Sequence, residues 1–249
     1  MPTERCHTRP IDASSVQRGF TLVELAIVLV IVALLAGGML VSLSTSRDMA
    51  NEKETQKQLA SINEALLGYA AAQQRLPCPA VVATTGIESP AGGGVCTTSF
   101  TGFLPAITLG ITPTNAQGYA IDAWGNPVRY AVTNANANAF TTTGGLKAAW
   151  AVNPATIVPD LRVCNTAANI AAADCPAADQ LTNTAVAIVF STGSNGGATP
   201  TAADELANWT TSNDRVFVSA TPSTAFDDLI VWLSPNILYN RMISAGRLP

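Results

Sequence analysis

The stretch that decides the fold of this chain is RGFTLVE at residues 18–24, which leads directly into an apolar segment that continues to Val41. Residues 20–41 number 22, and all of them are apolar, Gly or Thr except Glu24. About 20 such residues in a helix, at roughly 1.5 Å each, match the thickness of a bilayer core. A charged carboxylate inside a bilayer costs on the order of 2.5–3.5 kcal/mol unless something pairs with it. The segment therefore predicts a membrane helix in which Glu24 has a partner.

The residues that precede this segment carry more positive than negative charge. Arg5, Arg9 and Arg18 stand against Glu4 and Asp12. Such an excess keeps the N-terminus on the cytoplasmic side and sends the rest of the chain outward. An ordinary secretory signal does not fit, because its apolar core has only about 7–15 residues and a small-x-small cleavage site follows it.

The junction at residues 19–24 resembles the signal of type IV prepilins and pseudopilins, in which Gly, Phe, Thr, Leu, a variable residue and Glu precede an apolar helix. The resemblance implies that a prepilin peptidase cuts between Gly19 and Phe20 and methylates the new N-terminus. It also implies that Glu24 of one subunit faces the Phe20 amine of a neighbour during assembly. Three segments are then expected: a cytoplasmic leader that is removed (1–19), a transmembrane and filament-core helix (20–41), and a periplasmic pilin-like head that includes the second half of the helix (42–249).

One long helix is predicted from residue 20 to about residue 75. Beyond the membrane segment, Leu59, Ile62 and Leu66 recur at helical spacing, and Pro77 ends the pattern. Residues 77–118 read as loops, and residues 160–183 read as a loop with a short helix. Strands are expected at 128–132, 149–152, 185–190, 215–218 and 228–233, with a closing helix at 236–245. The predicted fold class is α+β: a long N-terminal helix packed on an antiparallel sheet, pilin-like, with a loop-rich, disulfide-bonded head.

The chain has five cysteines, of which Cys6 falls in the leader. The other four form an even set outside the inner membrane, which is typical of disulfides and allows three connectivities. Short-range pairing is favoured, Cys78 with Cys96 and Cys164 with Cys175, and each bond would close a loop of roughly 10–20 residues. A zinc site is not expected, because the chain has no CxxC spacing and its single histidine, His7, falls in the leader.

A second resemblance lies at residues 122–127, DAWGNP. The segment is similar to the Asp-x-Trp-Gly-x-Pro segment of the major pseudopilins of type II secretion, where it forms a structural turn. Here Asp122 would cap the turn, Trp124 would pack, and Gly125 and Pro127 would shape it. The two cysteine pairs and the other loops depart from the compact major pseudopilin, so a major and a minor subunit both remain open.

No cofactor is the favoured interpretation, and calcium is an alternative that the resemblance raises, since some pseudopilin heads bind it near the C-terminus. The available carboxylates are Asp204, Asp214, Asp227 and Asp228, but they lack EF-hand spacing. A turn that enters a strand is the favoured reading of Asp227 and Asp228. No other cofactor and no enzymatic activity are expected, because the mature chain would contain no histidine for a Ser/His/Asp or Cys/His arrangement.

These observations predict a pilin-like structural subunit that is processed by prepilin peptidase. Its partners would be the inner membrane, an assembly platform and other pilins or pseudopilins, in a type IV pilus or a type II secretion pseudopilus. One alternative is a minor pilin whose head binds a surface, a ligand or DNA. Another is a single-pass, membrane-anchored periplasmic protein that does not assemble. A formal net charge of −4 and scattered cationic residues disfavour nucleic acid.

Overall fold

The computed structural model describes residues 19–170, 174–209 and 214–249, without the side chains of residues 36–45. The predicted leader, apart from Gly19, therefore lies outside the described residues. The chain forms two compact units, residues 1–47 and residues 48–249.

Helix α1 extends over Leu22–Gln73 and so agrees with the predicted helix to within two residues at each end. Its first part, to residue 47, makes up the described helical portion of the first unit. Apolar side chains there are largely exposed, including Leu22, Val23 and Leu34. Among the described residues, no helix combines the length and the apolar character needed to cross a membrane.

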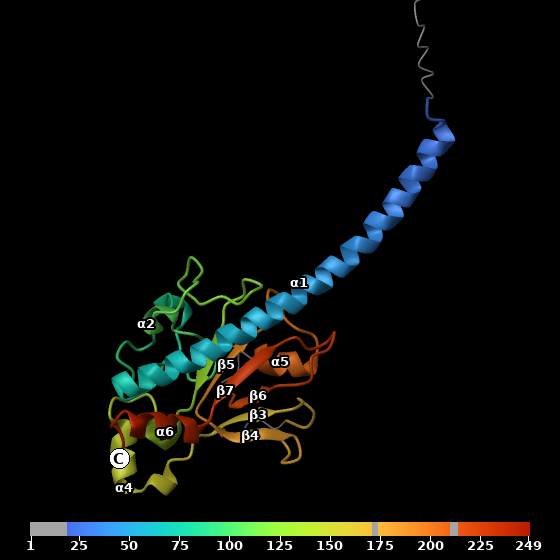
Figure 1. Ribbon diagram of the computed structural model, residues 1–249. Helices are drawn as coiled ribbons and strands as arrows, with labels where there is room; N and C mark the ends of the chain where they lie inside the picture. Colours follow the sequence, from blue (N-terminus) through green and yellow to red (C-terminus); the bar gives the residue numbers. More distant parts are fainter. Residues whose placement is uncertain (1–18, 171–173, 210–213) are drawn as a thin grey trace, which may run out of the picture. The chain divides into compact units, whose positions relative to one another are not determined.

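The second unit contains two sheets. The first is a four-stranded antiparallel sheet in the order β1 (Gly102–Phe103), β2 (Arg129–Val132), β5 (Ala187–Ser191) and β7 (Leu229–Leu233). The second is a three-stranded sheet in the order β4 (Gln180–Ala185), β3 (Leu161–Cys164) and β6 (Val216–Val218). Within this unit, α1 from residue 48 and α6 (Pro235–Ser244) lie on one side of β5 and β7, and β3, β4 and β6 lie on the other (Figure 1).

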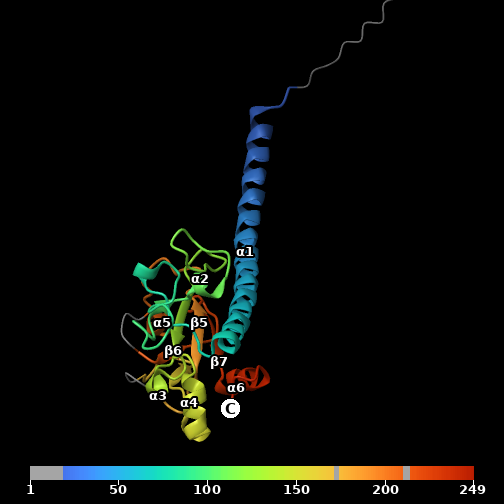
Figure 2. The same cartoon turned by 90° about the vertical axis from the view of Figure 1, so that its left-hand side faces the viewer.

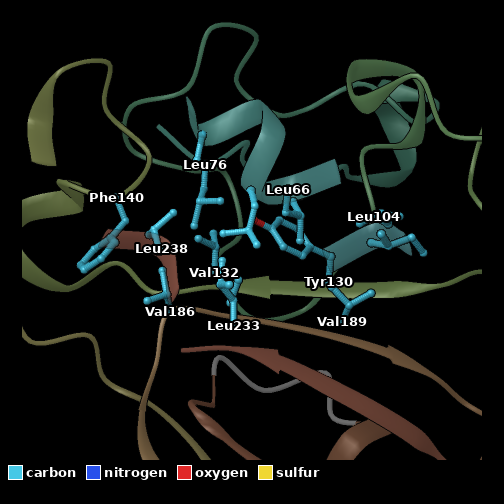
Figure 3. Close-up of a cluster of buried hydrophobic side chains, with 14 of the residues drawn as sticks. Leu66, Leu76, Leu104, Tyr130, Val132, Phe140, Val186, Val189, Leu233 and Leu238 are labelled. Atoms are coloured by element: carbon cyan, nitrogen blue, oxygen red, sulfur yellow. The ribbon is translucent and has the colours of Figure 1, made fainter. Parts of the chain in front are cut away.

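Alternation along the central strands produces two cores, because successive side chains of a strand point to opposite faces. In β5, Val189 joins the core beneath the helices, whereas Ile188 and Phe190 join the core between the sheets. The predicted face of α1 lies in the first of these cores with Tyr130, Val132 and Leu238 (Figure 3). Its members, buried to 1% exposure or less, are Leu59, Ile62, Leu66 and Ala70.

Helix α6 lies beside the last part of α1 in both views (Figures 1 and 2). Arg241 of α6 forms an ion pair with Glu64 at 2.5 Å, and Arg247 donates from Nε to the carbonyl of Ala71 at 2.8 Å. Helix α1 ends after Gln73, where Gln74 adopts a left-handed φ of +59°. A left-handed residue at this position is a common end of a helix, although Gly is the usual choice.

The prediction of a strand at 149–152 was wrong, because these residues belong to helix α4 (Gly145–Val152). A short apolar run does not distinguish a strand from a buried helix turn. Here Leu146 and Trp150, four residues apart, both reach the core beneath the helices. The remaining short helices are α2 (Ala106–Leu109), α3 (Ala135–Asn138), α5 (Ala203–Trp209) and the 3₁₀ turns η1 (Val82–Thr84) and η2 (Pro154–Thr156).

The segment 160–183, expected as a loop with a short helix, instead supplies strands β3 and β4. Strand β4, QLTNTA, is half-exposed at the edge of its sheet, so no hydrophobic alternation marked it. Strands β3 and β6 are parallel, which corrects the expectation of a purely antiparallel arrangement. The α+β class itself is confirmed, with an antiparallel main sheet.

Two disulfides are present, Cys78–Cys96 and Cys164–Cys175. They are the two short-range pairings that the sequence favoured. The first lies in the segment that follows α1, and the second begins at the end of β3.

Candidate functional site

The predicted cleavage junction lies immediately before α1. Gly19 is exposed, and no atom outside its immediate chain neighbours lies within 4 Å of the place where a Cβ would stand. Phe20 is 78% exposed. Both residues therefore lie in accessible chain, which is what a peptidase needs in order to bind its substrate in an extended form.

Glu24 lies in the first turn of α1, with its side chain exposed. Its backbone N–H donates to Thr21 Oγ1 at 3.2 Å, and the N–H of Leu25 donates to the carbonyl of Thr21 at 3.1 Å. Thr21 is therefore the N-cap, and Thr-x-x-Glu is the sequence signature of a capping box. The sequence reasoning missed this role of Thr21, although the signature is visible in residues 21–24.

The comparisons with known proteins bear on this helix start. A family model described as the prokaryotic N-terminal methylation motif matches residues 14–40. The chain carries the type IV pilin and pseudopilin signal. No curated protein and no solved structure matches the chain.

The DAWGNP turn of the head forms a closed hydrogen-bond arrangement. Asp122 Oδ1 accepts the backbone N–H groups of Trp124 at 2.9 Å and Asn126 at 2.8 Å. Gly125 adopts a φ of +89°, a conformation that favours glycine, and its N–H donates to the carbonyl of Asp122. Pro127 follows in an isolated bridge with Ile121. These contacts form a structural turn.

This turn is fastened to α1. The hydroxyl of the fully buried Thr55 accepts the N–H of Ala123 at 3.2 Å, and Gln58 Nε2 donates to the carbonyl of Ile121 at 2.7 Å. Trp124 packs against the core beneath the helices. The turn therefore positions the start of β2 against the helix.

The second carboxylate oxygen of Asp122 accepts the hydroxyl of Ser191 at 2.5 Å, and both residues are buried. Burial raises the pKa of the Asp122 carboxyl, and the hydrogen bonds from Ser191 and the turn backbone offset only part of that rise. Asn126 Nδ2 donates to the carbonyl of Gly193 at 2.7 Å. The turn thus also holds the glycine-rich loop that follows β5.

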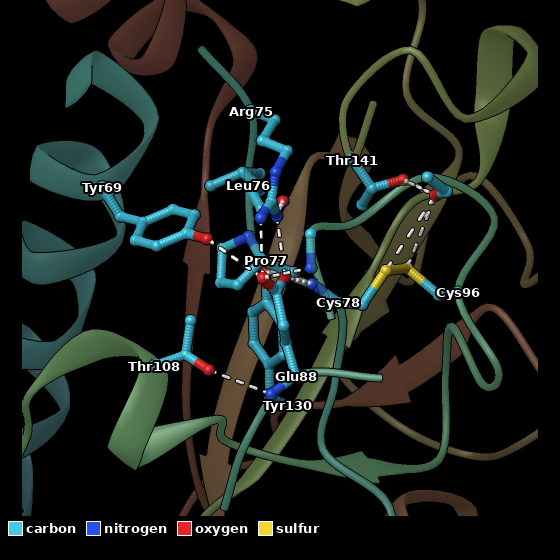
Figure 4. Close-up of polar contacts among 12 residues, drawn as sticks. Tyr69, Arg75, Leu76, Pro77, Cys78, Glu88, Cys96, Thr108, Tyr130 and Thr141 are labelled. Atoms are coloured by element: carbon cyan, nitrogen blue, oxygen red, sulfur yellow. Dashed lines mark hydrogen bonds and ion pairs between the residues drawn. A yellow bond between two sulfur atoms is a disulfide. The ribbon is translucent and has the colours of Figure 1, made fainter. Parts of the chain in front are cut away.

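A buried ion pair stands just beyond the end of α1 (Figure 4). Arg75 donates from both terminal nitrogens to Glu88, at 2.6 and 2.7 Å, and each side chain is 5% exposed. Glu88 also accepts hydrogen bonds from the hydroxyl of Tyr69 and from the backbone N–H groups of Cys78 and Gly92. Sequence reasoning missed this pair, because Arg75 and Glu88 are separated by a loop with no periodic pattern.

Burial by itself raises the pKa of Glu88, but the hydrogen bonds from Arg75 and from the backbone outweigh it, so the pKa lies below its ordinary value. Burial and the charge of Glu88 raise the pKa of Tyr69 to about 12. The network therefore holds a carboxylate, a guanidinium and a neutral phenol at physiological pH. It ties the end of α1 to the loop that carries the Cys78–Cys96 bond.

The four aspartates considered for calcium do not meet at one place. Asp204 Oδ1 accepts from the backbone N–H of Ala167, and Asp214 Oδ1 accepts from the backbone N–H of Val216. The structure instead brings Asp227 and Asp228 together with Glu205, whose carboxylate oxygens lie within 4.8 Å of theirs. Sequence reasoning did not include Glu205, because it lies in α5, which had no recognised pattern.

The chemistry of this cluster fits a hard cation only in part. Oxygen atoms are the ligands that calcium prefers, and it takes six to eight of them. All three carboxylates already accept protein hydrogen bonds: Glu205 from Asn195, Asp227 through Oδ2 from Ser194, and Asp228 from Asn208. Oδ1 of Asp227 is buried and has no partner among the described residues. Burial, together with the charges of Glu205 and Asp227, raises the pKa of Asp228 to about 7, so a proton can remove one of the negative charges of the cluster without a metal.

Proposed function

We propose that this chain is a pilin-like structural subunit that prepilin peptidase cleaves between Gly19 and Phe20 and methylates at Phe20. The observation that carries the proposal is the match of the N-terminal methylation motif to residues 14–40. The exposed junction and the helix that begins at Leu22 support it. In this proposal residues 1–19 form the cytoplasmic leader, and residues 20–41 first anchor the subunit in the inner membrane and later enter the filament core.

The proposed role of Glu24 is to neutralise the N-terminal amine of Phe20 on a neighbouring subunit. Two opposite charges in a low-dielectric environment offset their desolvation only when their geometry is good. The pair would therefore fix the register in which subunits dock. The exposed side chain of Glu24 is free to make such a contact, because its capping interaction with Thr21 uses its backbone N–H.

The proposed role of the head, residues 42–249, is to form the outer part of the filament on the periplasmic side. The packing of α1 from residue 48 on an antiparallel sheet supports a pilin-like arrangement. The two disulfides support a head that folds in an oxidising compartment. Assembly into a type IV pilus or a type II secretion pseudopilus, with an assembly platform and other pilins as partners, uses non-covalent contacts and needs no catalytic group.

The first experiment measures the intact mass and the N-terminal sequence of the protein from its native membrane. The expected product begins at N-methylated Phe20. Gly19→Val should block cleavage, because the peptidase needs a small, flexible residue at this position. A chain that keeps residues 1–19 in cells with an active prepilin peptidase would refute the proposal and leave a membrane-anchored protein that does not assemble.

The second experiment isolates the charge of Glu24. Glu24→Gln keeps the residue type that a capping box accepts and removes only the negative charge. We expect normal membrane insertion and cleavage but a much smaller fraction of the subunit in sheared filaments. Glu54→Gln, at an exposed position farther along α1, is the matched control and should assemble normally. Equal incorporation of the two variants would rule out the pairing role.

A further inference from the structure

Three aromatic side chains and one guanidinium contact one another in series at one end of the main sheet. The rings of Tyr119 and Phe103 are stacked with their centroids 4.3 Å apart. The guanidinium of Arg129 lies over Phe103 at 4.5 Å from its centroid and over Trp209 at 5.7 Å. Arg129 is the first residue of β2, and it is paired with Phe103 of the neighbouring strand β1. The strand register therefore builds this stack.

Arg129 differs from the other arginines of the second unit, residues 48–249. It makes no hydrogen bond and no ion pair with any described residue, although it is only half-exposed. The others, all of which contact a carboxylate or a carbonyl, are Arg75, Arg162, Arg215, Arg241 and Arg247. Burial lowers the pKa of Arg129, and no nearby carboxylate offsets the effect.

The guanidinium of Arg129 keeps its hydrogen-bonding capacity although it contacts two aromatic rings. Its five N–H donors lie in its own plane, and none of them is used by a hydrogen bond to a described residue. The edge of the guanidinium is therefore the place where a polar group can bind. Planar guanidinium edges match carboxylate and phosphate oxygens in a bidentate manner.

The space beside this edge is small. A cavity of about 10 Å³ is lined by Phe100, Gly102, Arg129, Asn208 and Trp209, together with Asp214. That volume is about the size of a single water, so a ligand would place one charged group at the edge and lie mostly outside. Asp214 forms no ion pair with Arg129 within 4.0 Å, and one of its oxygens is already used by the N–H of Val216.

We propose that the guanidinium of Arg129, which lies over Phe103 and Trp209, is a binding site for an oxyanion, a carboxylate or a phosphate, held at its N–H donors. The positive charge without an ion pair among the described residues and the free N–H donors together favour this ligand class. The oxyanion has two sources, a free phosphate-type ion or the acidic side chain of another protein segment. The site does not depend on the filament role proposed above.

The test uses the full-length chain in detergent, labelled with 5-fluorotryptophan. The four tryptophans give four ¹⁹F resonances, and Trp209→Phe identifies the one in the stack. Sodium phosphate and a tetraglutamate peptide are titrated separately at constant ionic strength. We expect the Trp209 resonance to shift and saturate while those of Trp124, Trp150 and Trp232 stay in place. A shift with phosphate points to a free ion, and a shift with the peptide alone points to an acidic protein segment.

Two lysine variants provide the matched comparison. Arg129→Lys keeps the charge but loses the planar donors, and it should weaken binding at least about tenfold. Arg162→Lys changes an arginine that already pairs with Asp174 and should leave binding unchanged. Should Arg129→Lys fail to fold, the Nε–Hε signal of Arg129 in the wild-type chain must itself shift on titration.

Three results would overturn the proposal. The first is the absence of a saturating shift with either probe. The second is equal affinity of Arg129→Lys and the wild type. The third concerns the Asp214→Asn variant: its Trp209 resonance is already shifted without any probe, and phosphate or peptide causes no further change. That result would identify Asp214 as the partner of Arg129.

Discussion

Replacement of Glu88 by Gln should destabilise the head strongly. The carboxylate of Glu88 accepts five hydrogen bonds, from two nitrogens of Arg75, from Tyr69 and from two backbone N–H groups. A glutamine has a single acceptor oxygen, so its NH₂ group would face other hydrogen-bond donors. The charge of Arg75 would then stay buried without a counter-ion. Breaking a buried pair in this way costs about 3–5 kcal/mol. For a domain of this size the corresponding fall in Tm is roughly 6–20 °C.

The assay is thermal unfolding of the full-length chain in detergent, followed by near-ultraviolet circular dichroism. Glu64→Gln is the matched control, because Glu64 pairs with Arg241 at a similar distance but with side chains 68% and 48% exposed. An exposed pair contributes only about 0–1 kcal/mol. Replacing both buried partners, with Arg75→Met and Glu88→Leu, should recover only the part that the unpaired charge costs, because the other donors to Glu88 would still lose their acceptor. Similar small costs for Glu88→Gln and Glu64→Gln would refute the reasoning.

Two further predictions concern the stability of the head. The pKa of the Asp228 carboxyl is about 7 in the folded protein and about 3.9 in an unfolded chain. The stability that this difference in pKa contributes is therefore fully present below about pH 4 and is lost as the pH rises to 7. In EDTA, Asp228→Asn should therefore gain stability over the wild type as pH rises, by up to about 1.4 kcal/mol per pH unit. A constant difference in urea melts between pH 4 and 8 would contradict this. Replacing Cys164 and Cys175 by Ala should lower the free energy of unfolding by about 3 kcal/mol, because an 11-residue separation no longer constrains the unfolded chain. Unchanged urea midpoints under oxidising conditions would exclude a stabilising role for that bond.

Strong local patterns predicted the parts of the molecule that their own residues specify. The spacing of Leu59, Ile62 and Leu66 predicted the buried face of α1, because helical periodicity and burial act over a few turns. The Asp122 turn was visible in the same way, because Asp, Gly and Pro restrict the backbone at their own positions. Short loops also made the two local disulfide pairings the simplest choice.

Weak local patterns failed where partners far along the chain decide the conformation. Strand β4 is polar and becomes a strand because β3 supplies its hydrogen bonds. Residues 149–152 form a helix because Trp150 reaches a core that includes residues of α1 and α6. Neither partner lies within the window over which propensity acts.

By itself the sequence determined the methylation motif at residues 14–40, the helix that begins within it and the turn at residues 122–127, because each depends on neighbours in the chain. Only the tertiary structure decided which charges are neutralised. It buried Arg75 with Glu88, gathered Glu205 with Asp227 and Asp228, and placed Arg129 over the rings of Phe103 and Trp209. Burial and Coulomb energy depend on distance in space, and no pattern of neighbouring residues encodes those distances.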